Sequence, residues 1–185
     1  ATNLSDIASM GCTPLYALYD ITIPRISESW IKRFFDGTRK LLNQHKVSII
    51  GGDTTKGPMS ISITLIGVQK NKILTRSGAK TGHDIYVTGN IGSARAALIL
   101  DKKTKGYKYF RKSPVMPLPR VAVGLELSEF ASSCIDISDG LEKDLKSIAI
   151  SSKKGFQVDV DSIPTDPKFD IYVKGNLKEQ CILGG

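Results

Sequence analysis

The hydrophobic residues of this chain recur with two different periods, and the change from one period to the other most constrains its fold. Between residues 15 and 23, apolar side chains occupy every second position, which predicts a strand with one buried face. Residues 28–43 change to three- and four-residue steps, which predict a helix with one apolar stripe. Residues 59–65 then alternate strictly again. Strands and helices therefore interleave, which indicates an α/β (α+β) fold.

The remaining elements follow from shorter patterns. Ser27 is the expected N-cap of the first long helix. Further strands are expected at residues 47–50, 85–88, 134–137 and 156–160, and further helices at residues 93–100 and 119–129 and after residue 140. Residues 70–82 are basic and contain glycine, so we place a domain boundary there, giving domains 1–72 and 73–185.

Composition excludes several classes of protein. The chain has 185 residues, of which 41% are hydrophobic, and no apolar run approaches the ~20 residues that cross a bilayer. Its start lacks the basic and then apolar pattern of a secretory signal. The three cysteines and two histidines are scattered, which argues against a zinc site and favours reduced thiols. We therefore expect a cytoplasmic protein without membrane contact.

The net charge of +8 permits an anionic partner. Its densest part is residues 102–112, where cations alternate with Tyr107, Tyr109 and Phe110. Interleaved aromatic and cationic side chains can bind single-stranded nucleic acid, although a solvated surface segment is the simpler interpretation. A nucleic-acid-binding module is thus an alternative function, and the main interpretation has no nucleic-acid partner.

Three segments offer aspartates at expected breaks in regular structure: residues 3–6 (NLSD), 51–55 (GGDTT) and 136–140 (DISDG). Carboxylates, hydroxyls and glycine-freed amides together suit magnesium and phosphate. Two like unit charges about 4 Å apart repel by about 4 kcal/mol at an effective dielectric of about 20, so bare aspartates would repel a polyphosphate. Aspartates in a phosphate site are therefore better explained as metal ligands than as general bases.

Each segment also has a purely structural explanation. Ser5 and Asp6 could cap a helix through residues 4–10. Residues 51–53 could form an ordinary turn between strands. Ser138 or Asp139 could be the N-cap of the following helix. The chain contains neither G-x-x-x-x-G-K-[ST] nor G-x-G-x-x-G, which disfavours a P-loop ATPase, a protein kinase or a Rossmann dehydrogenase.

Four segments in order resemble those of thiamine-monophosphate kinases. They are residues 3–11 (NLSDIASMG), 51–58 (GGDTTKGP), 75–82 (TRSGAKTG) and 136–141 (DISDGL). The family motifs they resemble are N-L-S-D-x-A-A-M-G, G-G-D-T-T-x-G-P, R-S-G-A-K-P-G-D and D-I-S-D-G-L. Together they span most of the chain. Single motifs would not distinguish this family from other enzymes of the aminoimidazole ribonucleotide synthetase-like superfamily.

The resemblance implies the two-domain fold of that superfamily, with an N-terminal dimerising domain and a C-terminal α/β domain. It implies a homodimer, with ATP as co-substrate and several Mg²⁺ ions in a cleft between the domains. Members of the family begin earlier than this chain and continue beyond it into a G-G-D-D-Y-E-L run. Both domains are therefore expected to be partial here, the first at its start and the second at its end.

Carried over position by position, the resemblance assigns metal binding to four aspartates, namely Asp6, Asp53, Asp136 and Asp139. It assigns ATP contacts to Gly52, Asp53, Arg76 and Ser138, and the catalytic roles to Asp53 and Arg76. Arginine suits phosphate through its planar fork of donors. Thr81 and His83 depart from the family pattern, as does Cys12, and none of the three is a proposed ligand.

The implied reaction is phosphorylation of thiamine monophosphate to thiamine diphosphate by ATP, a kinase reaction with a phosphate group as acceptor. Such catalysis depends mainly on positioning and electrostatic stabilisation. A second hypothesis keeps the fold and changes the acceptor, as in aminoimidazole ribonucleotide synthetase or selenophosphate synthetase. A third is a scaffold that dimerises without activity.

Overall fold

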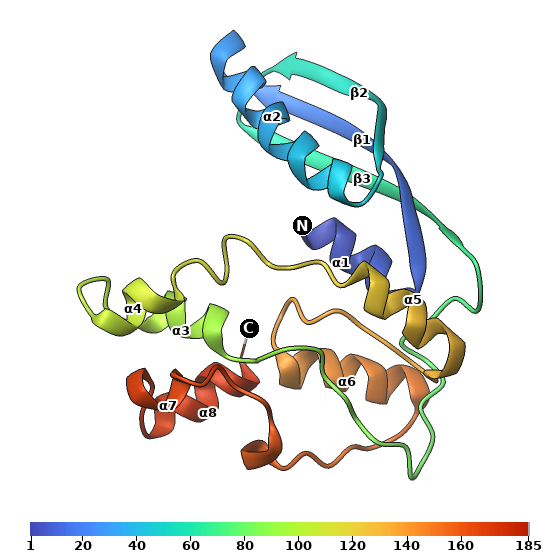
Figure 1. The fold of residues 1–185 in the computed structure, drawn as a ribbon, viewed down its shortest axis with the longest axis vertical. Coiled ribbons are helices and arrows are strands. Elements are labelled where there is room, and N and C mark those ends of the chain that lie inside the picture. Colours follow the sequence, from blue (N-terminus) through green and yellow to red (C-terminus); the bar gives the residue numbers. More distant parts are fainter. Residues whose placement is uncertain (185) are drawn as a thin grey trace. The chain divides into compact units, whose positions relative to one another are not determined.

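A computed structural model describes residues 1–184 and divides the chain into two compact units (Figure 1). The first unit contains residues 1–73 and 119–130, and the second holds the rest of the described chain. None of the helices formed by residues 1–184 combines the length and hydrophobicity that a bilayer-spanning helix needs. The first change of unit falls after Ile73, inside the basic stretch at residues 70–82. The functional division into residues 1–72 and 73–185 stays a prediction.

A three-stranded sheet forms the centre of the first unit. Its strands are β1 (Cys12–Ile23), β2 (Ser48–Lys56) and β3 (Ser60–Gln69), in the spatial order β2-β1-β3. β2 runs parallel to β1, and β3 runs antiparallel to it. Helix α2 (Glu28–Gln44) lies across one face of this sheet (Figure 1). The predicted strands and helix of this region are confirmed, as is Ser27 as N-cap, whose side chain accepts the Trp30 N–H.

Alternation along β1 fixes which face of the sheet is buried. Ala17, Tyr19, Ile21 and Ile23 point to the same side and are at most 5% exposed. They form a core with α2, in which the Tyr19 ring meets those of Phe34 and Phe35 at centroid distances of 6.1 and 5.8 Å. Burial of these side chains holds α2 on the sheet. The opposite face carries the paired residues Asp20 and Asp53, and Thr22 and Thr55, of β1 and β2.

Two further helices complete the first unit, α1 (Thr2–Ser9) and α5 (Val121–Phe130). α5 packs on α1 and β1 although it follows them by about a hundred residues. The approach is close because Gly124 has no side chain: a Cβ there would lie 2.0 Å from the Ala8 carbonyl oxygen. The helix predicted at residues 119–129 is therefore correct as an element, but it packs within the first unit.

The second unit is mainly helical in the described residues. Its elements are α3 (Ser93–Ile99), α4 (Lys105–Phe110), α6 (Leu141–Ser152), the 3-10 helix η1 (Val160–Ser162), α7 (Phe169–Tyr172) and α8 (Asn176–Leu183). Its core contains Ala96 and Ala97 of α3, Phe110 of α4, Phe169 of α7 with the following Val173, and Cys181 and Ile182 of α8. The helices predicted at residues 93–100 and after residue 140 are confirmed, and α4, α7 and α8 were not predicted.

Three predicted strands are wrong. Residues 85–88, 134–137 and 156–160 belong to no strand, and only an isolated bridge between Ile91 and Thr165 occurs in this unit's described part. Their apolar residues gave a strand-like pattern, but a strand also needs a partner for its backbone groups. The Cys134 N–H, for example, makes a single bond, to the Thr75 carbonyl at 3.0 Å.

Candidate functional site

Asp6 is exposed on the middle turns of α1. The helix begins at Thr2 with Ala1 as its N-cap, so the alternative that Ser5 and Asp6 cap a helix is wrong. Leu4, Ile7 and Ala8 face inward and anchor the helix. Asp6 is thereby presented to solvent from a packed element, and its carboxylate is open to a ligand.

Gly52 and Asp53 lie within β2, not in a turn, so the turn alternative is also wrong. Gly52 has φ of 132°, and a Cβ there would lie 1.9 Å from the Tyr19 carbonyl oxygen. Only glycine allows β2 to approach β1 so closely. Gly52 therefore has a structural role in addition to its predicted contact with ATP, and the sequence did not reveal that structural role.

Asp53 is held by hydrogen bonds on both sides. Its Oδ1 accepts the Thr54 N–H at 2.7 Å, and its own N–H donates to Oδ1 of Asp20 at 3.1 Å. Asp20 and Asp53 are direct partners in the ladder, so their side chains share the face opposite α2. Asp20 was not among the predicted site residues, although the alternation of residues 15–23 already put it on the polar face.

Arg76 lies in an exposed loop that is fastened to α6. The Ser152 hydroxyl donates to the Arg76 carbonyl at 3.1 Å and accepts the Ala79 N–H at 3.1 Å. Gly78, with φ of 120°, sits where a Cβ would be 2.3 Å from the Ser132 carbonyl oxygen. The loop backbone is therefore fixed, while the Arg76 side chain remains exposed and available to an anion.

The turn from Asp136 to Gly140 leads into α6. Gly140 is the helix N-cap with φ of 114°, so Ser138 and Asp139 are not the cap and that alternative is wrong. Ser138 and Asp139 are exposed, and Oδ2 of Asp139 pairs with Lys143 Nζ at 2.6 Å. This hydrogen bond and the Asp139 charge raise the pKa of Lys143.

Asp144 holds this turn, a role that the sequence alone did not predict. Its Oδ2 accepts the N–H groups of Ser138 and Asp139 at 3.0 and 3.1 Å. The signal that could have revealed it is its position, because Asp144 falls between Leu141 and Leu145 on the buried stripe of α6. A charged residue on such a stripe needs partners there.

The structure brings some predicted residues together. Ser138 and Asp139 share one turn and one carboxylate partner, and Gly52 and Asp53 are neighbours on one strand. Among residues 1–184, no three His, Cys, Asp or Glu side chains gather as a ready-made metal site. The metal and ATP assignments therefore stay predictions.

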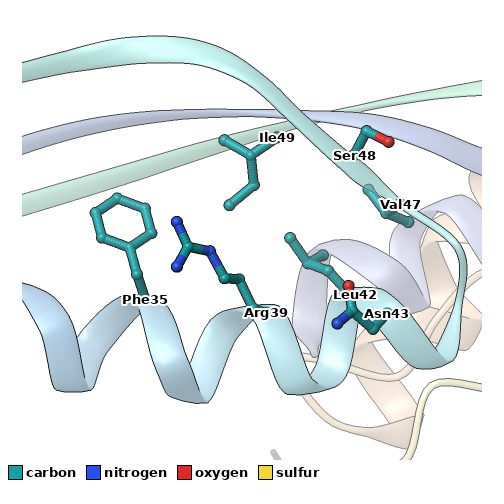
Figure 2. A pocket seen from close by; sticks show the side chains of 7 residues that line it. All are labelled: Phe35, Arg39, Leu42, Asn43, Val47, Ser48 and Ile49. Carbon is teal, nitrogen blue, oxygen red and sulfur yellow. The ribbon is translucent and has the colours of Figure 1, made fainter.

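A pocket of 520 Å³ lies between α2 and the start of β2 (Figure 2). Phe35, Arg39, Leu42 and Asn43 reach into it from the helix, opposite Ile49 of the strand. The Arg39 guanidinium lies 5.9 Å from the centre of the Phe35 ring. None of the predicted site residues lines this pocket, so it is separate from the candidate site.

The basic segment at residues 102–112 folds partly into α4. Phe110 is 1% exposed in the core of the second unit, so it cannot stack on a base. The Tyr109 hydroxyl donates to Asp166 at 3.2 Å, and Lys168 lies 5.1 Å from its ring centre. Two of the three aromatic residues thus have structural partners.

The sequence was compared with protein-family models and with known proteins to find what this chain is similar to. Residues 1–69 match the model of "AIR synthase related protein, N-terminal domain". A thiamine-monophosphate kinase of Buchnera aphidicola (subsp. Schizaphis graminum) is 42% identical over 171 residues, 89% of this chain and 53% of that protein. The sequence-based resemblance to thiamine-monophosphate kinases is confirmed.

Solved structures of this kinase group agree with the fold. The thiamine-monophosphate kinase of Stenotrophomonas maltophilia matches with a TM-score of 0.91 and 38% identity, over all of this chain and 62% of that one. The structure of AaThiL complexed with AMPPCP and TMP matches with a TM-score of 0.89 and 25% identity, over all of this chain and 63% of that one. The predicted mixed α/β fold is therefore confirmed. The chain spans between half and two thirds of the length of these relatives.

Proposed function

We propose that the protein containing this chain transfers the γ-phosphate of ATP to thiamine monophosphate, forming thiamine diphosphate. The observation that supports this most is the similarity to thiamine-monophosphate kinases along the whole chain, including AaThiL complexed with AMPPCP and TMP. The four motif segments fall within the matched region. The activity is thus that of a phosphotransferase with a phosphate acceptor.

The proposed metal ligands fit Mg²⁺ chemically. Asp6, Asp53, Asp136 and Asp139 all offer carboxylate oxygens, the donors this hard cation takes. Asp6, Asp53 and Asp139 are exposed, and the Thr54 N–H fixes the orientation of the Asp53 carboxylate. When bound, Mg²⁺ would neutralise charge on the phosphates.

The other residues act on the nucleotide in this proposal. The Arg76 guanidinium pairs with phosphate oxygens and stabilises negative charge, with its backbone fixed by Ser152. The Ser138 hydroxyl contacts ATP, and Gly52 lets the β2 backbone stay close to β1 beside Asp53. The acceptor phosphate has a second pKa of about 6, so it is largely ionised near neutral pH and needs no general base.

A cytoplasmic homodimer is part of the proposal. The first unit presents two edge strands, and β3 exposes Ile66 and Val68 on its face opposite α2, which a second copy would cover. All three cysteines are free thiols, in keeping with a reducing compartment. Light scattering on the complete protein measures the oligomeric state, and a monomer at all concentrations would contradict the dimer.

The deciding experiment incubates the complete protein with ATP, Mg²⁺ and thiamine monophosphate and detects thiamine diphosphate by mass spectrometry. The intact mass of the protein is measured on the same sample. Product formation with one ATP consumed per thiamine diphosphate supports the proposal. ATP turnover only with another acceptor of the superfamily, such as selenide, would replace it with the second hypothesis.

A further inference from the structure

Asp144 occupies an unusual place for a charged side chain. It is 6% exposed, and among residues 1–184 it is the only charged residue that the fold buries. It lies in the first turn of α6, next to Leu145 on the buried side of that helix. Burying a carboxylate is costly unless hydrogen bonds compensate it, so the bonds of Asp144 need an explanation.

The hydrogen bonds of Asp144 go to two residues of the proposed site, one assigned to ATP and the other to Mg²⁺. Oδ2 of Asp144 accepts the N–H of Ser138 at 3.0 Å and the N–H of Asp139 at 3.1 Å. Gly140, the N-cap between them and the helix, has no side chain with which to cap. A residue inside the helix therefore fixes the turn that precedes it.

The same bonds decide which ligand the turn can take. Exposed amides at the start of a helix usually bind anions such as phosphate. Here the amides of Ser138 and Asp139 are already satisfied by a carboxylate, which also adds a negative charge behind the turn. Asp139 and Asp144 together carry two negative charges against the single positive charge of Lys143, which pairs with Asp139, so the turn favours a cation over bare phosphate.

We propose that Asp144 is a positioning residue that orients Ser138 and Asp139 and makes nucleotide binding at this turn depend on Mg²⁺. The inference rests on the proposed use of ATP and Mg²⁺, and it adds a residue to which no role was assigned. Asp144 itself touches neither ligand; it acts through the backbone of Ser138 and Asp139. Outer-shell partners of metal ligands commonly act in this way.

The test compares Asp144→Asn with Glu142→Gln in the complete protein. Asparagine keeps the shape and an acceptor oxygen but removes the charge. Glu142→Gln removes a charge from the same helical turn, where Glu142 pairs with Lys146 at 2.5 Å. Calorimetry measures binding of AMPPCP with saturating Mg²⁺ and with EDTA, and thermal unfolding verifies the fold of each variant.

We expect Asp144→Asn to weaken AMPPCP binding with Mg²⁺ by about 10- to 100-fold. Binding in EDTA should be unchanged or tighter, because repulsion of the phosphates is reduced. Glu142→Gln should bind like the unaltered protein in both conditions. Equal weakening with and without Mg²⁺ would mean a merely structural role and would overturn the inference.

A second variant separates charge from folding. Asp144→Glu keeps the charge and should retain most of the ratio between binding with and without Mg²⁺, even if it lowers the unfolding temperature. If Asp144→Glu binds AMPPCP equally well with and without Mg²⁺, the charge of residue 144 does not cause the Mg²⁺ dependence. If the unaltered protein binds AMPPCP with Mg²⁺ and Asp144→Asn does the same, only this inference fails. If the unaltered protein binds AMPPCP in neither condition, the proposed function fails with it.

Discussion

At the scale of single residues, short hydrogen bonds to neighbouring groups hold two of the proposed metal ligands, Asp53 and Asp139. Asp53 accepts from Thr54 and donates to Asp20, while Asp139 donates to Asp144 and pairs with Lys143. These bonds limit the rotamers of carboxylates that are otherwise exposed. If these carboxylates bind a metal ion, the affinity depends on the charge of each carboxylate and on its position. Substitutions can change one of these properties without the other.

Asp53→Asn should abolish turnover while leaving the fold intact. Asparagine can still accept the Thr54 N–H, but it loses the charge that Mg²⁺ requires, so we expect activity to fall by more than about 100-fold. Steady-state kinetics and thermal unfolding measure the two effects. Asp36→Asn, on the exposed side of α2, is the control. Near-normal turnover in Asp53→Asn would remove Asp53 from the metal site.

Lys143→Gln should lower the Mg²⁺ concentration that half-saturates the enzyme. The Lys143 ammonium pairs with Oδ2 of Asp139 and would compete with a metal ion that the proposed function places there. Exposed ion pairs are weak, so the change should not exceed about fivefold. Lys146→Gln breaks the matched pair with Glu142 on the same helix and should have no effect. A higher Mg²⁺ requirement in Lys143→Gln would contradict the competition.

The raised pKa of Lys143 gives this pair a pH dependence of known sign. Because Asp139 raises the pKa in the folded protein, the pair is fully formed below the ordinary lysine pKa. Its contribution is lost only as the pH rises through the higher, folded value. Raising the pH within the neutral range should therefore not release Asp139 for the metal.

At the scale of elements, α6 connects two proposed parts of the site. The helix has 12 residues and is about 18 Å long. Asp144 near its start holds Ser138 and Asp139, and Ser152 at its end holds the loop of Arg76. One rigid helix thus sets the separation between the backbones of these two segments.

Ser152→Ala should loosen the loop of Arg76. The substitution leaves the Arg76 carbonyl and the Ala79 N–H without this partner, so hydrogen exchange at the Ala79 amide should become faster by about tenfold. Turnover should fall while the unfolding temperature changes little. The neighbouring Ser151→Ala, at an exposed position, is the control. An Ala79 amide as well protected as in the unaltered protein would contradict this role.

The elements also show what the sequence could reveal. Periodicity correctly located β1, α2 and β3, because each packs one apolar face into the same core and has a partner nearby in the chain. It failed at residues 85–88, 134–137 and 156–160, since apolar alternation cannot show whether a neighbouring strand exists. The role of Asp144 depends on a turn six residues earlier, and rules for N-caps examine only the residue at the helix start. The positions of the site motifs along the chain were predictable, but their hydrogen-bond partners were not.

At the scale of the whole molecule, the first compact unit is discontinuous in sequence. Residues 1–73 form its sheet and two of its helices, and α5 returns to it from residues 119–130. Gly124 makes that return possible through its contact with Ala8, and Gly11 lies where a Cβ would be 2.6 Å from Cβ of Ser128. The stability of this unit therefore depends on a segment distant in sequence.

Gly124→Ala should destabilise the first unit by more than about 2 kcal/mol, because its methyl group would overlap the Ala8 carbonyl. Fluorescence of Trp30, the single tryptophan of the chain, reports unfolding of this unit directly. Gly37→Ala, in the open interior of α2, should instead stabilise it by about 0.5–1 kcal/mol. A Gly124→Ala protein as stable as the unaltered one would show that α5 does not need this close contact.

The discontinuity also imposes a delay during synthesis. The ribosome adds about 5–20 residues per second, and Phe130 follows Ile73 by 57 positions. For about 3–11 seconds after the sheet has been translated, α1 has no α5 to cover it. During this interval the side of α1 that carries Ala8 lacks its later partner Gly124, so a chaperone that binds apolar segments would have its best access then.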